Sequence, residues 1–199
     1  MKILLVGASG AVGRAIAQTL GETHTIVPVG RTSGAYRADL TDDASVTALF
    51  REVGTVDAIV SATGHVHFGP LAQMNAAQFD IGLQDKLLGQ VRLALIGQHY
   101  LSDGGSITLT SGIVAEEPIA QGANATAVNC AIEGFVRAAA TELRGNRRIN
   151  AVSPTVLTES LERFAGFFPG FESVPAQRAA LAYQRSVEGV QTGRVYRVW

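Results

Sequence analysis

Two patterns of apolar and polar positions recur along the chain. Short runs of consecutive apolar residues, such as 3–6, are typical of strands that are buried on both faces of a parallel sheet. Elsewhere apolar residues recur every four positions, as at Val12, Ile16 and Leu20, which is typical of one face of a helix. The expected strands are 3–6, 24–29, 36–39, 56–61, 106–110, 149–152 and 194–198. The expected helices are one that begins near Val12 and those at 42–53, 84–101, 126–143 and 175–187.

Strands and helices alternate from one end of the sequence to the other, without repeats, low-complexity tracts or linker-like segments. This alternation predicts right-handed crossovers and an α/β fold, with a parallel sheet covered by helices on both faces. Ligands of such sheets bind beyond the carboxyl ends of the strands. Gly7, Gly30, Ser61, Ser111 and Pro154 all fall at these ends, so we expect them along one edge of the sheet.

The composition is that of an ordinary globular domain, with 199 residues, 47% hydrophobic and 17% charged. The net charge of −1 gives no reason to expect nucleic acid or an anionic membrane as a partner. Cys130 is the single cysteine, which excludes an internal disulfide and favours a reducing cytoplasm. The N-terminal apolar run stops at Gly7, too early for a signal peptide, and no apolar stretch reaches the roughly 20 residues that span a bilayer.

A glycine loop, "GASGAVG", joins the first strand to the first helix. Gly7 allows a sharp turn, Gly10 allows the backbone to approach a pyrophosphate, and Gly13 allows the helix to lie close to the sheet. The free N–H groups at the start of the helix favour an anion. The strand–loop–helix context therefore predicts a dinucleotide site, and the alternative interpretation is a plain tight turn.

Five further segments extend this pattern: "ADLTD" (38–42), "SATG" (61–64), "GGSITLTSG" (104–112), "INAVSPTV" (149–156) and "QTGRVYRV" (191–198). Together with the glycine loop, they resemble the motifs of the short-chain dehydrogenase/reductase family over essentially the whole chain. The glycine spacing is G-x-x-G-x-x-G here, where the family more often has G-x-x-x-G-x-G.

The resemblance implies a single Rossmann-type, doubly wound domain over residues 1–199, with strand order 3-2-1-4-5-6-7 and a substrate lid at about 155–190. It also implies a nicotinamide dinucleotide and a homodimer or homotetramer in which the Ala-rich helix 126–143 packs closely between subunits. Asp39 would face the adenine ring. The implied cofactor-binding residues are Gly7, Ser9, Gly10, Val12, Gly13, Arg31, Thr32, Asp39, Leu40, Ser61, Ala62, Thr63, Gly64, Pro154 and Val156.

The turn after the second strand bears on which nicotinamide cofactor binds. An acidic residue here would accept the adenosine ribose hydroxyls, whereas an arginine meets a 2′-phosphate. The chain has Arg31, followed by the hydroxyls of Thr32 and Ser33, and no acidic residue in this turn. We therefore expect NADP(H) rather than NAD(H). The alternative is that Arg31 is a solvated charge that only stacks on adenine.

The proton-transfer pair of the family, Tyr-x-x-x-Lys, has no counterpart in either register considered. Alignment on "GFVRAAATEL" places Ala125 and Asn129 at the two positions, and counting forward from Ser111 places Asn124 and Val128 there. General acid catalysis contributes roughly 10² to 10⁴ in rate, so the usual route to carbonyl reduction needs a replacement donor.

The resemblance suggests three catalytic candidates: Ser111 to bind a substrate oxygen, Lys86 to supply charge or a proton, and Asn129 at the position of the missing lysine. Lys86 falls where the family has a helix asparagine, and burial would lower its pKa. The non-functional alternatives are that Ser111 caps a helix or turn and that Lys86 is a solvated helix lysine. His65 and His67 are alternative acids or surface residues, and no third ligand near them favours a metal site.

Other side chains near these segments allow two interpretations each. Glu116 and Glu117 face substrate or solvent. Cys130 is expected to pack in a helix interface rather than to act as a nucleophile. Aromatic residues in the expected lid line an apolar pocket, or they anchor the lid to the core or form a subunit contact; they are Phe164, Phe167, Phe168 and Phe171.

The sequence thus predicts an NADP(H)-dependent oxidoreductase that acts on a small, partly apolar carbonyl or alcohol with an atypical proton donor. An alternative is a non-catalytic NADP(H)-binding protein that senses redox state or binds a partner. A third is another reaction on the same fold, such as isomerisation or dehydration.

Overall fold

A computed structural model describes residues 1–164 and 166–199. In this part of the chain, seven strands form one sheet in the order β3-β2-β1-β4-β5-β6-β7, and every neighbouring pair is parallel. The predicted fold class and strand order are therefore confirmed. The strands are β1 (Lys2–Val6), β2 (Thr25–Gly30), β3 (Tyr36–Arg37), β4 (Val56–Ser61), β5 (Leu101–Thr110), β6 (Arg148–Pro154) and β7 (Val195–Val198).

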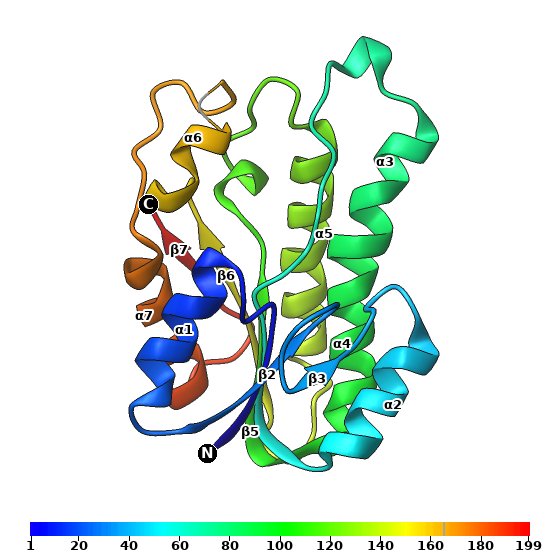
Figure 1. The fold of residues 1–199 in the computed structure, drawn as a ribbon, viewed down its shortest axis with the longest axis vertical. Coiled ribbons are helices and arrows are strands. Elements are labelled where there is room, and N and C mark those ends of the chain that lie inside the picture. The colour runs from blue at the N-terminus through cyan, green and yellow to red at the C-terminus, as the bar shows by residue number, and fades with distance from the viewer. Residues whose placement is uncertain (165) are drawn as a thin grey trace.

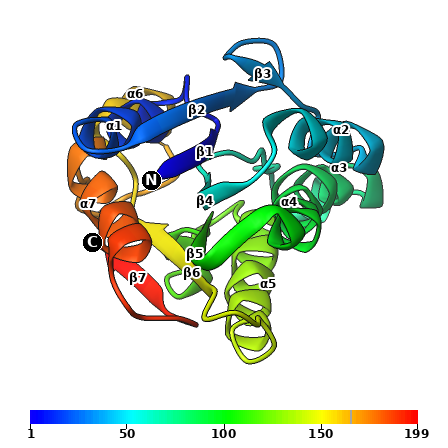
Figure 2. The same cartoon turned by 90° about the horizontal axis from the view of Figure 1, so that it is seen from below.

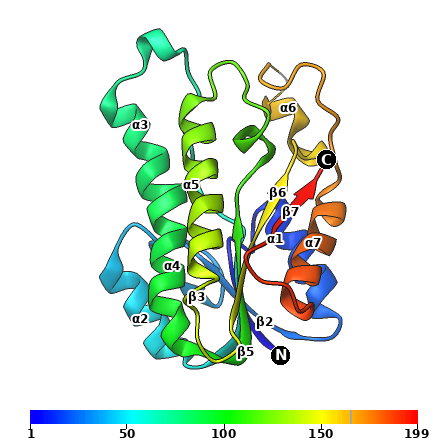
Figure 3. The same cartoon turned by 180° about the vertical axis from the view of Figure 1, so that it is seen from behind.

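Helices cover both faces of the sheet, as Figure 2 shows from below. One layer holds α1 (Ala11–Gly21) and α7 (Ala176–Glu188), which pack against each other. The other layer holds α2 (Asp43–Val53), α4 (Gly89–Gly97) and α5 (Ala123–Ala139), of which α4 and α5 stand side by side in Figure 3. Shorter helical segments are η1 (Leu71–Gln73), α3 (Ala76–Gly82), η2 (Leu83–Leu88), η3 (Gln98–Tyr100), η4 (Ile113–Ala115), η5 (Thr158–Ser160) and α6 (Leu161–Phe164).

The consecutive apolar residues of β1 serve two separate cores. Leu4 and Val6 pack under the α2/α4/α5 layer, whereas Ile3 and Leu5 pack under the α1/α7 layer. Successive side chains of a strand point to opposite faces, so a strand covered on both sides has no polar positions to alternate with. This is why the sequence shows unbroken apolar runs.

The helix predicted at 84–101 was wrong at both ends. The helical path begins at α3, where Asn75 and Gln78 form a reciprocal capping box, and it continues through the π-helical segment η2 into α4. It leaves α-helical geometry after Gly97, and β5 starts at Leu101, five residues before the predicted strand. The helix predicted at 126–143 corresponds to α5, which begins three residues earlier and ends four residues earlier than predicted. After Ala139 the chain tightens into turns such as Thr141 N–H to Ala138 O.

The connections that follow β4, β5 and β6 gather at one end of the molecule, above the carboxyl ends of the strands (Figure 1). They run approximately from 62 to 75, from 111 to 122 and from 155 to 175. Sequence-distant segments therefore meet at this end, as the fold class requires. None of the helices in the described residues is both long and apolar enough to cross a membrane.

Candidate functional site

The glycine loop leaves β1 in a tight turn that only glycine fits. Gly7 has a φ of +84°, and a Cβ there would lie 2.5 Å from the carbonyl oxygen of Ala62. A Cβ at Gly13 would overlap the carbonyl group of Gly7. At Gly10, in contrast, the nearest atom to a Cβ lies 3.5 Å away, so the space around it is open. The fold itself therefore requires two glycines, and the middle one keeps an exposed approach to the start of α1 clear.

A cavity of about 200 Å³ lies beside this loop and is called here the glycine-loop cleft. Six of the predicted cofactor-binding residues line it: Gly7, Ser9, Arg31, Thr32, Leu40 and Thr63. The cleft is completed by Val6, Gly30, Ser33, Ala38, His65 and Asp85. The predicted residues Gly10, Val12, Gly13, Asp39, Ser61 and Ala62 are not part of this lining.

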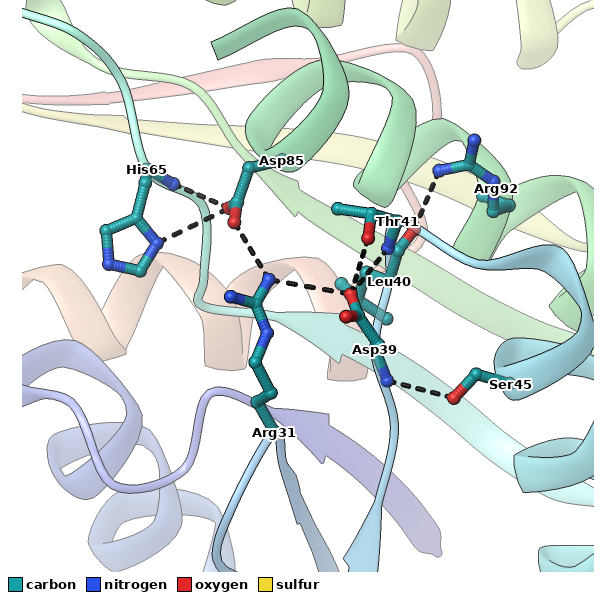
Figure 4. A network of polar contacts seen from close by, with 8 residues as sticks. All are labelled: Arg31, Asp39, Leu40, Thr41, Ser45, His65, Asp85 and Arg92. Carbon is teal, nitrogen blue, oxygen red and sulfur yellow. Dashed lines mark hydrogen bonds and ion pairs between the residues drawn. The ribbon is translucent and has the colours of Figure 1, made fainter. Parts of the chain in front are cut away.

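Arg31 is held at the cleft by two carboxylates, as Figure 4 shows. Its Nη2 lies 3.0 Å from Asp85 Oδ2 and 3.5 Å from Asp39 Oδ1. Asp39 also accepts hydrogen bonds from the backbone N–H and the hydroxyl of Thr41, at 2.9 and 2.8 Å. These bonds, first of all the one from the backbone, hold the pKa of Asp39 below its usual range. Asp85 could not be recognised as a partner from the sequence, because it comes from η2, 54 residues after Arg31.

A second cavity, of about 290 Å³, lies beyond the carboxyl ends of β5 and β6 and is called here the apolar cavity. It contains all three catalytic candidates, Ser111, Lys86 and Asn129, together with the predicted cofactor residues Gly64, Pro154 and Val156. The other lining residues are Val66, Phe68, Thr110, Gly112, Ile113, Val114, Ala125, Thr155, Leu157, Ser160, Phe164 and Phe168.

Lys86 projects from η2 into this cavity. Its Nζ donates a hydrogen bond to the carbonyl oxygen of Ser111 at 3.1 Å. Desolvation lowers the pKa of Lys86 to about 8. Room for the side chain comes from Gly64, where a Cβ would lie 2.5 Å from Lys86 Cγ. Lys86 can thus exchange a proton near neutral pH.

Gln90 fastens this part of the helical path to the sheet and was missed from the sequence. It is fully buried, and its amide nitrogen donates to the carbonyl oxygens of Lys86 and Thr110 at 3.1 and 2.9 Å. Its amide oxygen accepts the backbone N–H of Thr110 at 2.8 Å. Gln90 therefore fixes the backbone of Lys86 relative to the end of β5, one residue before Ser111.

The hydroxyl of Ser111 is directed at Glu133, which the sequence analysis also missed. Ser111 Oγ donates to Glu133 Oε1 at 2.9 Å, and both residues are buried. Glu133 Oε2 accepts from Arg137 at 3.1 Å. Because the proton of Ser111 points at this carboxylate, the oxygen of Ser111 faces other ligands as a hydrogen-bond acceptor. The helical spacing of Asn129 and Glu133, four residues apart, could have indicated that they share a face.

Asn129 is 2% exposed, and its Oδ1 has no hydrogen-bond partner among the described residues. The side chain lines the apolar cavity, with Nδ2 close to Gly112. A buried amide without a partner is costly, so this group is available to a ligand that enters the cavity.

The structure separates the remaining candidates from the apolar cavity. His65 lines the glycine-loop cleft, with Nδ1 3.5 Å from Asp85 Oδ1, and His67 lines neither cavity. Glu116 pairs with Arg197 at 2.7 Å, and Glu117 is exposed. The expectation that Cys130 is packed was wrong: it is exposed on α5, and its thiol donates to Ala115 O at 3.3 Å.

Some phenylalanines of the expected lid line the cavity, and others pack against neighbouring aromatic rings. Phe164 and Phe168 line the apolar cavity. Phe167 packs on Phe68, with ring centroids 4.9 Å apart, and Phe171 packs edge-on against Phe168 at 5.4 Å. Within the range 155–190, α7 packs on α1, so the part above the cavity is the stretch before α7. Its action as a lid stays a prediction.

Comparisons with known proteins agree on one family. The profile of the family described as "Enoyl-(Acyl carrier protein) reductase" matches residues 7–196. The chain is 45% identical to the protein lin1944 from Listeria innocua, whose crystal structure superposes with a TM-score of 0.99 and full coverage of both chains. A small-chain dehydrogenase solved in complex with NADPH is 27% identical, with a TM-score of 0.88 and coverage of 100% of this chain and 96% of that one.

Among curated proteins, versicolorin reductase 1 from Aspergillus parasiticus is 29% identical over 177 residues, which cover 76% of this chain and 67% of that protein. A hydroxynaphthalene reductase-like protein from Metarhizium brunneum is 28% identical, with 66% of its length covered. The chain thus spans about two thirds of the length of these relatives. The sheet order, the glycine loop and the extent of these matches show that the chain belongs to the short-chain dehydrogenase/reductase family, whose members use NAD(P).

Proposed function

We propose that the chain is an NADP(H)-dependent oxidoreductase that acts on a small carbonyl or alcohol with a proton donor other than the family tyrosine. One observation carries the proposal: neighbouring residues line two different cavities. Asp85 and His65 line the glycine-loop cleft, whereas Lys86 and Gly64 line the apolar cavity. The cleft and the cavity therefore adjoin along the same two segments. A dinucleotide needs this arrangement, because its phosphate-bearing end would lie in the cleft and its reactive end at the cavity.

The residues present suit such a cofactor. Gly10 keeps the approach to the helix start open, which favours a pyrophosphate. Arg31, Thr32 and Ser33 offer a cation and hydroxyls beside the cleft for a 2′-phosphate. A relative solved with NADPH supports the same choice. When bound, the nicotinamide supplies or accepts the hydride.

The apolar cavity would hold the substrate oxygen near three polar groups: an ammonium, an amide and a hydroxyl. The Lys86 ammonium donates a proton or stabilises negative charge on the oxygen, since its pKa of about 8 suits proton transfer near neutral pH. The Asn129 amide is free to bind a polar group, and Ser111 accepts a hydrogen bond. The surrounding Phe68, Val156 and Phe168 favour an apolar body for the substrate.

The replacement of the family's Tyr-x-x-x-Lys pair is part of this proposal. Ala125 and Asn129 both line the apolar cavity, which supports the alignment that places them at the tyrosine and lysine positions. Asn124 instead binds the backbone of His67 and Phe79, at 2.9 and 2.7 Å. An alanine methyl group has no proton to give, so the donor must come from elsewhere in the cavity.

Titration with NADPH and NADH, followed by nicotinamide fluorescence and then by a panel of carbonyl substrates, tests the function. We expect tighter binding of NADPH and its oxidation by at least one apolar carbonyl. The Lys86→Met variant should lose about 10² to 10⁴ in turnover, with NADPH affinity unchanged. Turnover that survives in Lys86→Met would remove Lys86 from the mechanism. Failure to bind either dinucleotide would refute the function itself.

The alanine at position 125 also favours a second candidate, a non-catalytic NADP(H)-binding protein that senses redox state or binds a partner. The same titration separates the two. Tight NADPH binding without turnover across a broad carbonyl and alcohol panel would favour the second candidate.

A further inference from the structure

Arg31 and Asp85 bridge the glycine-loop cleft from two elements that are distant in sequence (Figure 4). Arg31 follows β2, and Asp85 lies on η2. Their side chains meet at 3.0 Å, between Nη2 and Oδ2, and both residues line the cleft. We call this ion pair the clasp. A dinucleotide whose adenosine end occupies the cleft must contact or open it.

The two halves of the clasp are anchored unequally. Asp85 Oδ1 accepts the backbone N–H of His65 at 2.7 Å, and the Asp85 side chain is only 18% exposed. The Arg31 side chain is 54% exposed, and its second carboxylate partner is Asp39, at 3.5 Å. The carboxylate is thus fixed by the backbone, while the arginine extends from an exposed turn. A competing anion would draw Arg31 away from Asp85 and leave Asp85 in place.

We propose that Asp85 is a specificity-determining residue that restrains the preference of the cleft for phosphate-bearing dinucleotides. The inference rests on the proposed function, in which Arg31 receives the 2′-phosphate. That phosphate must draw Arg31 away from Asp85 and then sits near the negative charge of Asp85, which opposes its binding. NAD(H) has a hydroxyl at the same position, and this hydroxyl can donate a hydrogen bond to a carboxylate without any charge repulsion. Asp85 therefore reduces the difference in affinity between NADP(H) and NAD(H) that Arg31 creates.

The test compares Asp85→Asn with Asp80→Asn. Asparagine keeps an oxygen that accepts the His65 N–H and removes only the charge. Asp80 is an exposed carboxylate on α3, five residues earlier, that binds Gln84 at 3.1 Å and does not line the cleft. Dissociation constants for NADPH and NADH are measured by fluorescence for both variants and for the wild type, with melting temperatures recorded alongside.

We expect Asp85→Asn to bind NADPH about fivefold more tightly, while its affinity for NADH stays equal or falls. Asp80→Asn should match the wild type. The gain should shrink when the salt concentration is raised from about 0.05 M to about 0.5 M, because a charge effect is screened and a change of shape is not. If Asp85→Asn lowers the melting temperature, Asp85→Ser provides a second removal of the same charge.

Three results would overturn the proposal in distinguishable ways. NADPH affinity that is unchanged or weaker in the folded Asp85→Asn variant, with tight binding in the wild type, refutes the role of Asp85 and leaves the proposed function standing. A gain that is equal for NADPH and NADH refutes a role in specificity. A wild type that binds neither dinucleotide refutes both the proposed function and the role of Asp85.

Discussion

The Ser111 hydroxyl donates a hydrogen bond to the Glu133 carboxylate, with 2.9 Å between Ser111 Oγ and Glu133 Oε1. Glu133 is 3% exposed, and it also accepts a hydrogen bond from Arg137, at 3.1 Å. The serine and the carboxylate come from the end of β5 and the middle of α5, so the bond ties a loop of the candidate site to a core helix. This hydrogen bond stabilises the fold, and it also fixes the orientation of the Ser111 hydroxyl.

Replacement of Glu133 by alanine is expected to lower the free energy of unfolding by about 2 kcal/mol. Ser111 would lose a buried charged acceptor, and the missing side chain would leave a space under α5. Urea unfolding measures the loss. Arg137→Ala is the matched control, because its side chain is 60% exposed and its half of the pair should contribute less than about 1 kcal/mol. Equal losses in the two variants would contradict the account of Ser111.

The rate of carbonyl reduction should fall as the pH rises through about 8. Desolvation lowers the pKa of Lys86 to about 8, so the side chain is protonated and able to donate below that pH and neutral above it. A pH profile of kcat/KM for reduction measures this. Lys86→Arg keeps its charge but cannot release a proton at these pH values, so it should reduce carbonyls slowly and without this fall. A flat wild-type profile between pH 7 and 9 would argue against Lys86 as the acid.

Lys86 should also make stability depend on pH. Its folded-state pKa of about 8 lies below the unfolded value near 10.4, so the unfolded state binds more protons between these pH values. Below pH 8 the buried charge of Lys86 lowers the free energy of unfolding. This loss is therefore recovered as the pH rises from about 8 to about 10. Lys86→Met should remove this rise, which chemical denaturation at several pH values can detect. The same rise in both proteins would assign it to other groups.

Two glycines of the loop should respond differently to an added methyl group. Gly13→Ala places a Cβ against the Gly7 carbonyl and should destabilise the fold by about 1–3 kcal/mol. Gly10→Ala meets nothing nearer than 3.5 Å, so it should change stability by less than about 1 kcal/mol. Its methyl group should still weaken dinucleotide binding, because it stands where the backbone must approach the pyrophosphate. A Gly10→Ala variant with undiminished NADPH affinity would contradict this placement.

Phe168 is expected to determine how well the cavity accepts bulky apolar substrates. It lines the apolar cavity and packs against Phe171, whereas Phe167 is not a lining residue and packs on the lining residue Phe68. Phe168→Ala should therefore change kcat/KM for aryl relative to small alkyl carbonyls by about tenfold, and Phe167→Ala should change this ratio less. Kinetics with a matched pair of substrates measures the ratio. A larger effect at Phe167 would indicate that the aromatic cluster acts through its own packing.

The fold could be predicted because its signals are local. Apolar runs bounded by glycine indicate buried strands, and these alternate with segments of helical periodicity, which predicts the fold class. The strand order came from the resemblance to the family motifs. The capping box of Asn75 and Gln78 is a local signal of the same kind, and it marks a helix start well before Gln84. The π-helical turn was not readable, since nothing in "LQDKLL" distinguishes it from an ordinary helix.

The candidate site was predictable where one residue acts from a known strand end, as Ser111 and Gly64 do. It was not predictable where the property belongs to a pair. The orientation of the Ser111 hydroxyl depends on Glu133, 22 residues away, and the charge around Arg31 depends on Asp85, 54 residues away. Arg31 taken alone indicated a free cation, and only the three-dimensional structure shows the carboxylates beside it.

Asp85 and Lys86 are consecutive residues of the π-helical segment η2, yet they line different compartments. Asp85 lines the glycine-loop cleft and Lys86 lines the apolar cavity. A π-helical turn holds more residues than an α-helical turn, so deletion of one residue from η2 would tighten the segment and shift its side chains relative to both compartments. A single-codon deletion here would therefore alter the lining of the cleft and of the cavity at once, while the rest of the sheet stayed intact.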